Sequence, residues 1–128
     1  METQFNMIKI DNGNNISVTR GDSLLLKLFI NEGDKMNPKR FLLKEHTGSA
    51  VYLGIMENKQ DFENAIVKYK FDENNVDENG DVTVKIKATD TLNLEPDTYF
   101  YEIKLVYYDS DEDEIVNTII PKSKFIVC

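Results

Sequence analysis

Cysteine, tryptophan and long apolar runs are almost or wholly absent from this sequence. Its one cysteine, Cys128, has no partner within the chain, which excludes an intramolecular disulfide. The first residues have neither the basic start nor the apolar run of a signal peptide, so we expect a protein made in the cytoplasm and not secreted. No stretch approaches the roughly 20 apolar residues of a membrane span, so we expect no membrane insertion.

Positive charge is scarce as well. The chain has 15 lysines and arginines against 23 aspartates and glutamates, which gives a formal net charge of −8. We therefore expect no nucleic-acid partner, because binding nucleic acid requires clustered cations that displace its counterions. The same charge disfavours anionic membrane surfaces, and it favours solubility and basic partners.

Recognisable catalytic arrangements are missing too. The only histidine, His46, belongs to no recognisable motif that combines a nucleophile, a base and an orienting acid. There is no glycine-rich phosphate loop, no paired-cysteine zinc motif and no Gly-x-Ser-x-Gly motif. We therefore predict a protein that is not an enzyme and that needs no cofactor.

What the sequence does contain is a two-residue alternation of apolar side chains. The chain has 128 residues, the size of one domain, and 41% of them are hydrophobic, too many for a disordered chain. Successive side chains of a β-strand point to opposite faces, so each alternating segment predicts a strand. These segments are Phe5–Ile10, Ile16–Val18, Leu24–Ile30, Val51–Ile55, Ala65–Phe71, Val82–Ile86, Tyr99–Tyr107, Ile115–Ile120 and Phe125–Cys128, of which the last two are separated by Pro121.

Helical periodicity is limited to two single-turn candidates, Gln60–Asn64 and Thr89–Leu94. Short strands separated by turns, without crossover helices, predict an antiparallel β-sandwich. We expect one all-β domain, residues 1–128, with an immunoglobulin-like sandwich of about seven to nine strands. The least regular region, Gly33–Ser49, is expected to be a long loop that residues 41–43 hold to the core.

Three turns have informative sequences. The Asn-Gly dipeptide within Glu78–Asp81 predicts a hairpin, because both residues tolerate positive φ. The segment Leu94–Tyr99 is typical of the corner before a late strand of immunoglobulin-like sandwiches, where a tyrosine hydroxyl bonds back to the preceding turn. Arg20-Gly21-Asp22 spells the integrin-binding tripeptide, but it lies between two predicted strands and we interpret it as a turn.

The predicted strands have more apolar residues than one buried face requires. In the segment TYFYEIKLVYY, from Thr98 to Tyr108, one face is wholly apolar or aromatic and the other is only half polar. An outward apolar cluster is unusual on a free monomer and marks a surface that something covers. The predicted outward-facing, interface-forming residues are Leu25, Phe29, Tyr52, Met56, Phe100, Val106 and Tyr108.

Three occupants of such a surface are open at this stage. The loop Gly33–Ser49, with the N-terminal segment, would cover it from within the same chain. Another protein subunit would cover it in an assembly, including a homo-oligomer. A carbohydrate would use the aromatic rings as a platform, although the chain has no tryptophan.

The acidic run Asp109–Glu114 is the one metal candidate. Asp109, Asp111 and Asp113 place carboxylates at alternate positions, as at the start of an EF-hand calcium loop. The sixth position is a glutamate where that loop needs glycine, and the twelfth is an isoleucine where it needs a bidentate glutamate. We therefore favour an acidic hairpin tip over a specific metal site.

Several strand and turn sequences together resemble a family. The string ISVTRGDSLLL (16–26), the strand Tyr99–Ile103 and the final strand Phe125–Val127 are similar to small β-sandwich proteins encoded in phages and prophages of low-GC Gram-positive bacteria. Within that group the chain resembles the N-terminal domain of phage baseplate upper proteins, although we expect no helical stalk or receptor-binding extension within these 128 residues.

The resemblance implies a virion component without catalysis. Its partners would be other phage structural proteins, on the capsid or on the tail and baseplate, and it carries over no active-site residues. The alternative function is a module that binds host-surface glycans through loop aromatics and acidic tips, with or without calcium.

Overall fold

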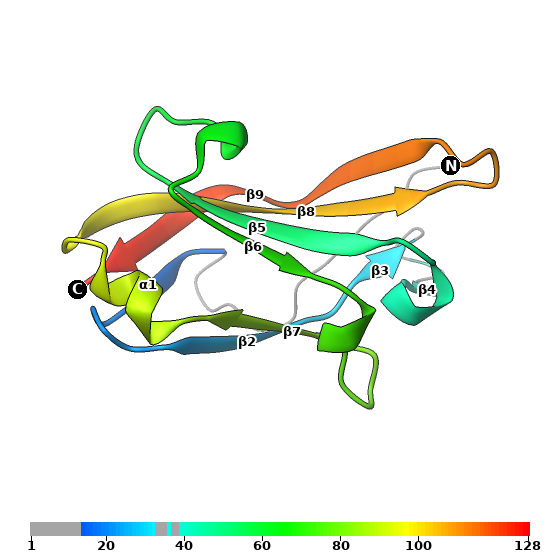
Figure 1. The fold of residues 1–128 in the computed structure, drawn as a ribbon, viewed down its shortest axis with the longest axis horizontal. Helices are drawn as coiled ribbons and strands as arrows, with labels where there is room; N and C mark the ends of the chain where they lie inside the picture. The colour runs from blue at the N-terminus through cyan, green and yellow to red at the C-terminus, as the bar shows by residue number, and fades with distance from the viewer. Residues whose placement is uncertain (1–13, 33–35, 37–38) are drawn as a thin grey trace.

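The structure, a computed structural model, describes residues 14–32, 36 and 39–128 (Figure 1). It is mostly β, as predicted, with one short helix among the described residues. The predicted strand Phe5–Ile10 lies outside these residues. The larger sheet has the strand order β1-β9-β8-β5-β6, with β1 at Ile16–Val18, β9 at Glu114–Val127, β8 at Asp97–Tyr108, β5 at Ala50–Met56 and β6 at Val67–Phe71.

A second, two-stranded sheet faces the first one across the core (Figure 1). It pairs β2 with β7, and a further short ladder pairs β3 with β4. The bounds of the remaining elements are β2 at Leu24–Leu28, β3 at Asn31–Glu32, β4 at Lys39–Arg40, β7 at Val82–Ile86, α1 at Ala88–Leu92, and the 3-10 turns η1 at Leu43–Glu45, η2 at Phe62–Asn64 and η3 at Glu73–Asn75.

The alternation in the sequence explains the core. In β7, Val82, Val84 and Ile86 are buried, while Lys85 between them is exposed. In β8 the inward residues Tyr101, Ile103 and Leu105 are fully buried and pack with residues of both sheets. Burial of apolar area stabilises the fold by about 25 cal/mol per Å² before conformational costs.

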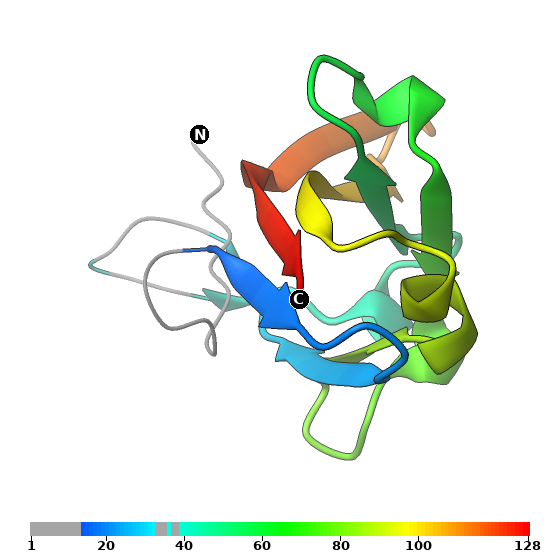
Figure 2. The same ribbon diagram turned by 90° about the vertical axis from the view of Figure 1, so that its left-hand side faces the viewer.

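Two features of the large sheet differ from the prediction. The ladder between β1 and β9 is parallel, whereas the other ladders of the described residues are antiparallel (Figure 2). Pro121 does not separate two strands but lies inside β9. The register between β8 and β9 shifts beside it, and a proline is tolerated where a bulge removes the need for its missing N–H.

The irregular region after β3 is attached to the core as expected. Phe41 and Leu43 are buried, and Leu42 is half-buried. The single helical turns also form near the predicted places, as η2 and α1.

The turn Arg20-Gly21-Asp22 fastens α1 to the start of β2. The guanidinium of Arg20 donates to the carbonyl of Leu92 at 2.9 Å, and Gly21 N donates to the hydroxyl of Thr91 at 3.1 Å. That hydroxyl lies 2.7 Å from the carbonyl oxygen of Asp22 and donates to it. The tripeptide is therefore used by the fold itself.

The corner before β8 has the predicted tyrosine. The hydroxyl of Tyr99 donates to the carbonyl oxygen of Glu95 at 2.7 Å. This bond ties the start of β8 to the turn that follows α1.

Candidate interaction surface

The seven predicted interface residues lie on two opposite faces of the molecule. Leu25 is on β2, and Phe29 follows it, on the outer side of the small sheet. The other five are on β5 and β8 of the large sheet, where register pairs Tyr52 with Lys104 and Met56 with Phe100. The seven residues therefore do not form one continuous surface.

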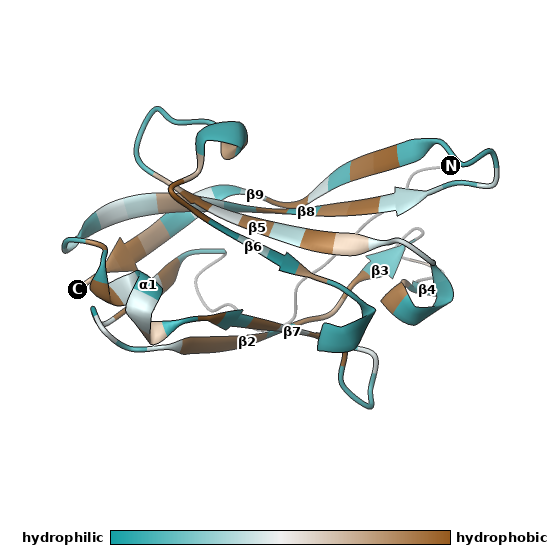
Figure 3. Cartoon of the chain, viewed as in Figure 1, coloured by the Kyte–Doolittle hydropathy of each residue, from teal (hydrophilic) through white to brown (hydrophobic). Residues whose placement is uncertain are grey.

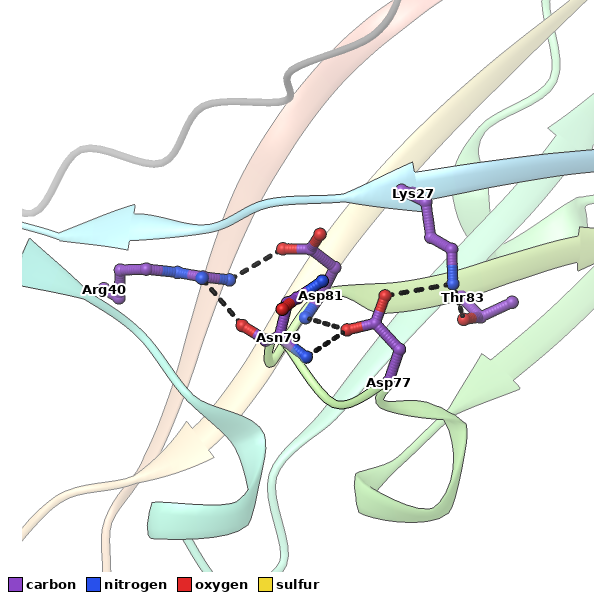
Figure 4. A network of polar contacts seen from close by, with 6 residues as sticks. All are labelled: Lys27, Arg40, Asp77, Asn79, Asp81 and Thr83. Carbon is purple, nitrogen blue, oxygen red and sulfur yellow. Dashed lines mark hydrogen bonds and ion pairs between the residues drawn. The ribbon is translucent and has the colours of Figure 1, made fainter.

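Phe29 is covered by its own chain. The guanidinium of Arg40 lies 3.9 Å from the centre of the Phe29 ring, in a cation–π contact. Arg40 also donates to the carbonyl of Asn79 at 2.8 Å and forms an ion pair with Asp81 at 2.7 Å (Figure 4). Arg40 belongs to the region Gly33–Ser49, so this region covers the Phe29 ring from within the same chain. Leu25, in contrast, is 62% exposed.

A second ion pair lies beside the first (Figure 4). The ammonium of Lys27 is 3.1 Å from the carboxylate of Asp77 and 2.7 Å from the hydroxyl of Thr83. The hydrogen bond from Lys27 lowers the pKa of the Asp77 carboxyl. Both pairs join the hairpin between η3 and β7 to its surroundings, so they have a structural role.

The outer face of the large sheet is covered in part by a lobe, residues 57–66, which stands above the sheet (Figure 1). A side chain added at Gly54 would come within 2.9 Å of the Phe62 ring and 3.1 Å of Ala65. Phe62 and Ala65 therefore lie directly over β5. Met56, which alternation places on this outer side, is fully buried at the base of the lobe.

Lysines and aromatic rings share the rest of this outer face. The register places Tyr52 between Lys70 of β6 and Lys104 of β8. The ammonium groups of three lysines lie 5.0–5.9 Å from ring centres, and the long lysine stems cover apolar surface while the charges stay in water. The pairs are Lys70 with Tyr52, Lys104 with Phe62, and Lys122 with Phe100.

This surface is named the lysine–aromatic face, and its members are Lys68, Lys70, Lys104, Lys122, Lys124, Tyr52, Phe62 and Phe100. Within the described chain, the ion pairs involve Arg20, Lys27 and Arg40, and none of the five lysines of the face. One carboxylate, Glu102, lies on the same outer side of β8, in register with Gly54 of β5. With five lysines and this one glutamate, the strands of the lysine–aromatic face have a net positive charge on a chain of net charge −8. Hydrophilic and hydrophobic residues alternate along the strands of the large sheet (Figure 3).

Beyond the lysine–aromatic face, the β8–β9 hairpin has apolar outer residues. Val106 pairs with Val116, and Tyr108 pairs with Glu114. Val116 is 50% exposed and Tyr108 is 44% exposed, with the Tyr108 ring over Gly48. The apolar surplus in the sequence is thus concentrated near the end of this hairpin.

The hairpin ends in the acidic tip, defined as residues Asp109–Glu114. One carboxylate oxygen of Asp109 accepts hydrogen bonds from the N–H groups of Asp111 and Asp113, both at 2.9 Å. The carboxylates of these three aspartates lie within 4.8 Å of one another, and all three residues are exposed. The structure therefore brings the three predicted metal candidates together in one loop at the end of the β8–β9 hairpin.

The tyrosines with shifted pKa values form hydrogen bonds that stabilise the fold. Burial raises the pKa of Tyr101, whose hydroxyl donates to the carbonyl of Asn14. Burial and nearby carboxylates raise the pKa of Tyr99, and burial together with the bond to Asp90 raises the pKa of Tyr69 to about 12. The one histidine, His46, stacks on Phe41 at 4.1 Å.

A hollow of about 500 Å³ lies beside the start of β8. Its lining is polar, and it includes two acids, Glu57 and Asp97, and the aromatic residues Tyr99 and Phe100. The Tyr99 hydroxyl is already occupied by Glu95, and Lys122 already lies over the Phe100 ring. We therefore regard this cavity as the margin of the lysine–aromatic face.

No protein-family profile matches the chain, and neither does any curated protein sequence. In the part of the chain that the structure describes, no helix has the length and apolarity needed to cross a bilayer.

Sequence reasoning found two of the three aromatic members of the lysine–aromatic face, but it missed Phe62 and the lysines. Tyr52 and Phe100 were among the predicted interface residues, whereas the lysines were not. The signal was present, because Lys68, Lys70 and Lys104 occupy outward positions of their strands. Only the register between strands that are distant in sequence shows that these lysines are neighbours.

Proposed function

We propose that this chain is a non-enzymatic structural component of a tailed-phage or prophage particle. It is an immunoglobulin-like module that docks on other structural proteins, on the capsid or on the tail and baseplate. The observation that carries the docking role is the lysine–aromatic face, where three of five lysines lie over aromatic rings and none of the five forms an ion pair with another described residue. Aromatic residues supply contact area in protein interfaces, and complementary charge supplies specificity.

Two features support the immunoglobulin-like assignment. Strands β5, β6, β8 and β9 share one sheet, while β2 and β7 share the other, which is the division of strands in immunoglobulin-like sandwiches of the variable type. The bond from the Tyr99 hydroxyl to Glu95 corresponds to the tyrosine corner of such folds. The assignment in turn supports a binding module, because these sandwiches present faces and end loops to partners.

The particle assignment is tested on the bacterium that encodes the chain. Phage particles are induced, purified on a density gradient and analysed by mass spectrometry. We expect the chain in the particle band, in a fixed ratio to the major capsid and tail proteins. Its absence from intact particles would refute the proposal. Binding to a glycan array that a chelator abolishes would instead support the glycan-binding alternative.

A further inference from the structure

We infer that the lysine–aromatic face binds the acidic tip of a second copy of this chain in a head-to-tail contact. The inference rests on the proposed function, which assigns the chain a docking role. It adds that the partner of the lysine–aromatic face is a second copy of the chain. Both surfaces belong to the same sequence, and their charges are opposite.

The lysine–aromatic face provides the cationic half of this contact. Lys70 and Lys104 flank Tyr52 in one cross-strand row, with their Cα atoms about 10 Å apart because each strand spacing is about 4.8 Å. Neither ammonium group forms an ion pair with another described residue, and each lies over an aromatic ring. Lys68 and Lys122 are fixed by backbone carbonyls of the lobe, at 2.6 and 2.9 Å.

The acidic tip provides the anionic half. Asp111, Glu112, Asp113 and Glu114 are exposed, and Asp111 and Asp113 hold their carboxylates close together on a loop that Asp109 orders through two hydrogen bonds. A pre-ordered loop loses less conformational entropy on binding than a mobile one.

Apolar surface accompanies the charge on both sides of the contact. Tyr108 and Val116 lie next to the acidic tip and are about half exposed. Tyr52 and Phe100 lie among the lysines of the face and are half-buried. The two surfaces are therefore complementary in polarity as well as in charge.

The contact has to form between molecules. Lys104 and the acidic tip belong to the same long strand and its hairpin, and this hairpin extends away from the lysine–aromatic face (Figure 1). A tip that binds a different patch on the next copy is a heterologous contact, which generates a ring or a filament. Repeated copies in a particle would then add avidity to each contact.

The test uses two charge-reversed variants of the full chain, studied by light scattering after size exclusion in reducing buffer. The face variant is Lys70→Glu with Lys104→Glu, and the tip variant is Asp111→Lys with Glu114→Lys. The matched controls are Lys85→Glu with Lys87→Glu on the small-sheet side, and Glu73→Lys with Glu78→Lys at other exposed positions. Circular dichroism establishes that each variant is folded.

We expect the wild-type chain and both controls to self-associate as concentration rises, and each charge-reversed variant to associate roughly ten-fold more weakly or not at all. An equimolar mixture of the two variants should associate again, because the acidic tip of one then meets the lysines of the other. Raising the salt from about 0.1 M to about 1 M shortens the Debye length from about 10 Å to about 3 Å and should weaken the wild-type assembly.

Three outcomes would overturn the inference: a wild-type chain that stays monomeric, variants that associate like wild type, or a mixture that does not recover. If the face variant does not fold, the tip variant and its control still decide between the outcomes, since the tip is an exposed loop. A chain that is found in particles but does not self-associate would refute this contact and leave the proposed function standing. If the chain self-associates through these residues but is absent from particles, the contact between copies stands and the proposed function is refuted.

Discussion

Gly80 and Glu112 occupy the same position in two hairpin loops of the same construction. Both have positive φ, at +85° and +63°. Each loop has five residues and begins and ends with an aspartate, Asp77 and Asp81 in one loop and Asp109 and Asp113 in the other. In both loops the carboxylate of the first aspartate accepts hydrogen bonds from the N–H groups two and four positions later. One loop therefore has the residue that this backbone favours, and the other does not.

The difference between these loops predicts opposite effects of two substitutions. Glu112→Gly should raise the free energy of unfolding by about 0.5–1 kcal/mol, because the left-handed conformation is strained for a residue with a Cβ. Gly80→Ala should lower it by more than about 1 kcal/mol, since the new Cβ would also lie 2.5 Å from Leu42. Urea denaturation measures both, and a less stable Glu112→Gly variant would contradict the argument.

Thr91 is the best single test of the connection between α1 and the Arg20-Gly21-Asp22 turn. Its side chain is fully buried, accepts from Gly21 N and donates to the carbonyl of Asp22. Thr91→Val keeps the shape and leaves both backbone groups without this partner, so we expect a loss of about 1–3 kcal/mol. Thr89→Val, at an exposed position of the same helix, is the control and should change stability little. Equal stability of the two variants would argue against the connection.

The alternation of apolar residues determined most of the described fold because it reports which side of a strand is buried. It predicted β1, β2, β5, β7 and β8 closely, and the turn sequence Leu94–Tyr99 separately predicted the hydrogen bond of Tyr99 at the corner. It could not show that β1 runs parallel to β9, because either direction of pairing gives the same alternation.

Two other differences arose from contacts between distant segments. Pro121 reads as a break between strands, but a register shift between β8 and β9 accommodates it. Met56 reads as an outward residue, but it is fully buried where the lobe 57–66 covers the sheet. A third difference is local: in the Asn-Gly hairpin only the glycine adopts positive φ, so the turn differs from the two-residue type that the dipeptide favours. Residue types at one position do not contain this information.

Tyr69 should make the protein less stable at alkaline pH. Its hydroxyl donates to Asp90 and accepts from Lys87 N at 3.1 Å, and burial, followed by the bond to Asp90, raises its pKa from 10.0 to about 12. Between these values the unfolded chain loses the proton and the folded chain keeps it, so stability is full below pH 10 and falls as the pH rises toward 12.

The corresponding measurement is urea unfolding at several pH values from about 9 to 12. We expect a shallower decline for Tyr69→Phe than for wild type, although a decline should remain because the pKa values of Tyr99 and Tyr101 are raised too. Tyr52→Phe, on the lysine–aromatic face, is the matched control. An identical slope for wild type and Tyr69→Phe would exclude this residue as the source.

Phe29 and Tyr108 should respond differently to truncation, although the sequence pattern treats them alike. Phe29→Ser removes a half-buried ring and its contact with Arg40, so we expect the free energy of unfolding to fall by about 1–3 kcal/mol. Tyr108→Ser removes a ring that is 44% exposed, so it should leave the fold largely intact and weaken assembly instead. Thermal unfolding and light scattering separate the two effects. A Tyr108→Ser variant that unfolds would show that Tyr108, like Phe29, stabilises the fold.

Asp109→Asn distinguishes a loop-ordering aspartate from a calcium ligand. The asparagine side chain retains an oxygen that can accept the two N–H groups of Asp111 and Asp113, whereas it removes a charge that calcium binding would need. We expect the melting temperature of the variant to stay within a few degrees of wild type, and neither protein to respond to excess calcium or to a chelator. Asp109→Ala removes the acceptor altogether and should cost about 1–2 kcal/mol. A wild-type melting temperature that rises with calcium, together with an Asn variant that does not respond, would assign the acidic tip to metal binding and remove the main support for its role as an ordered anionic surface.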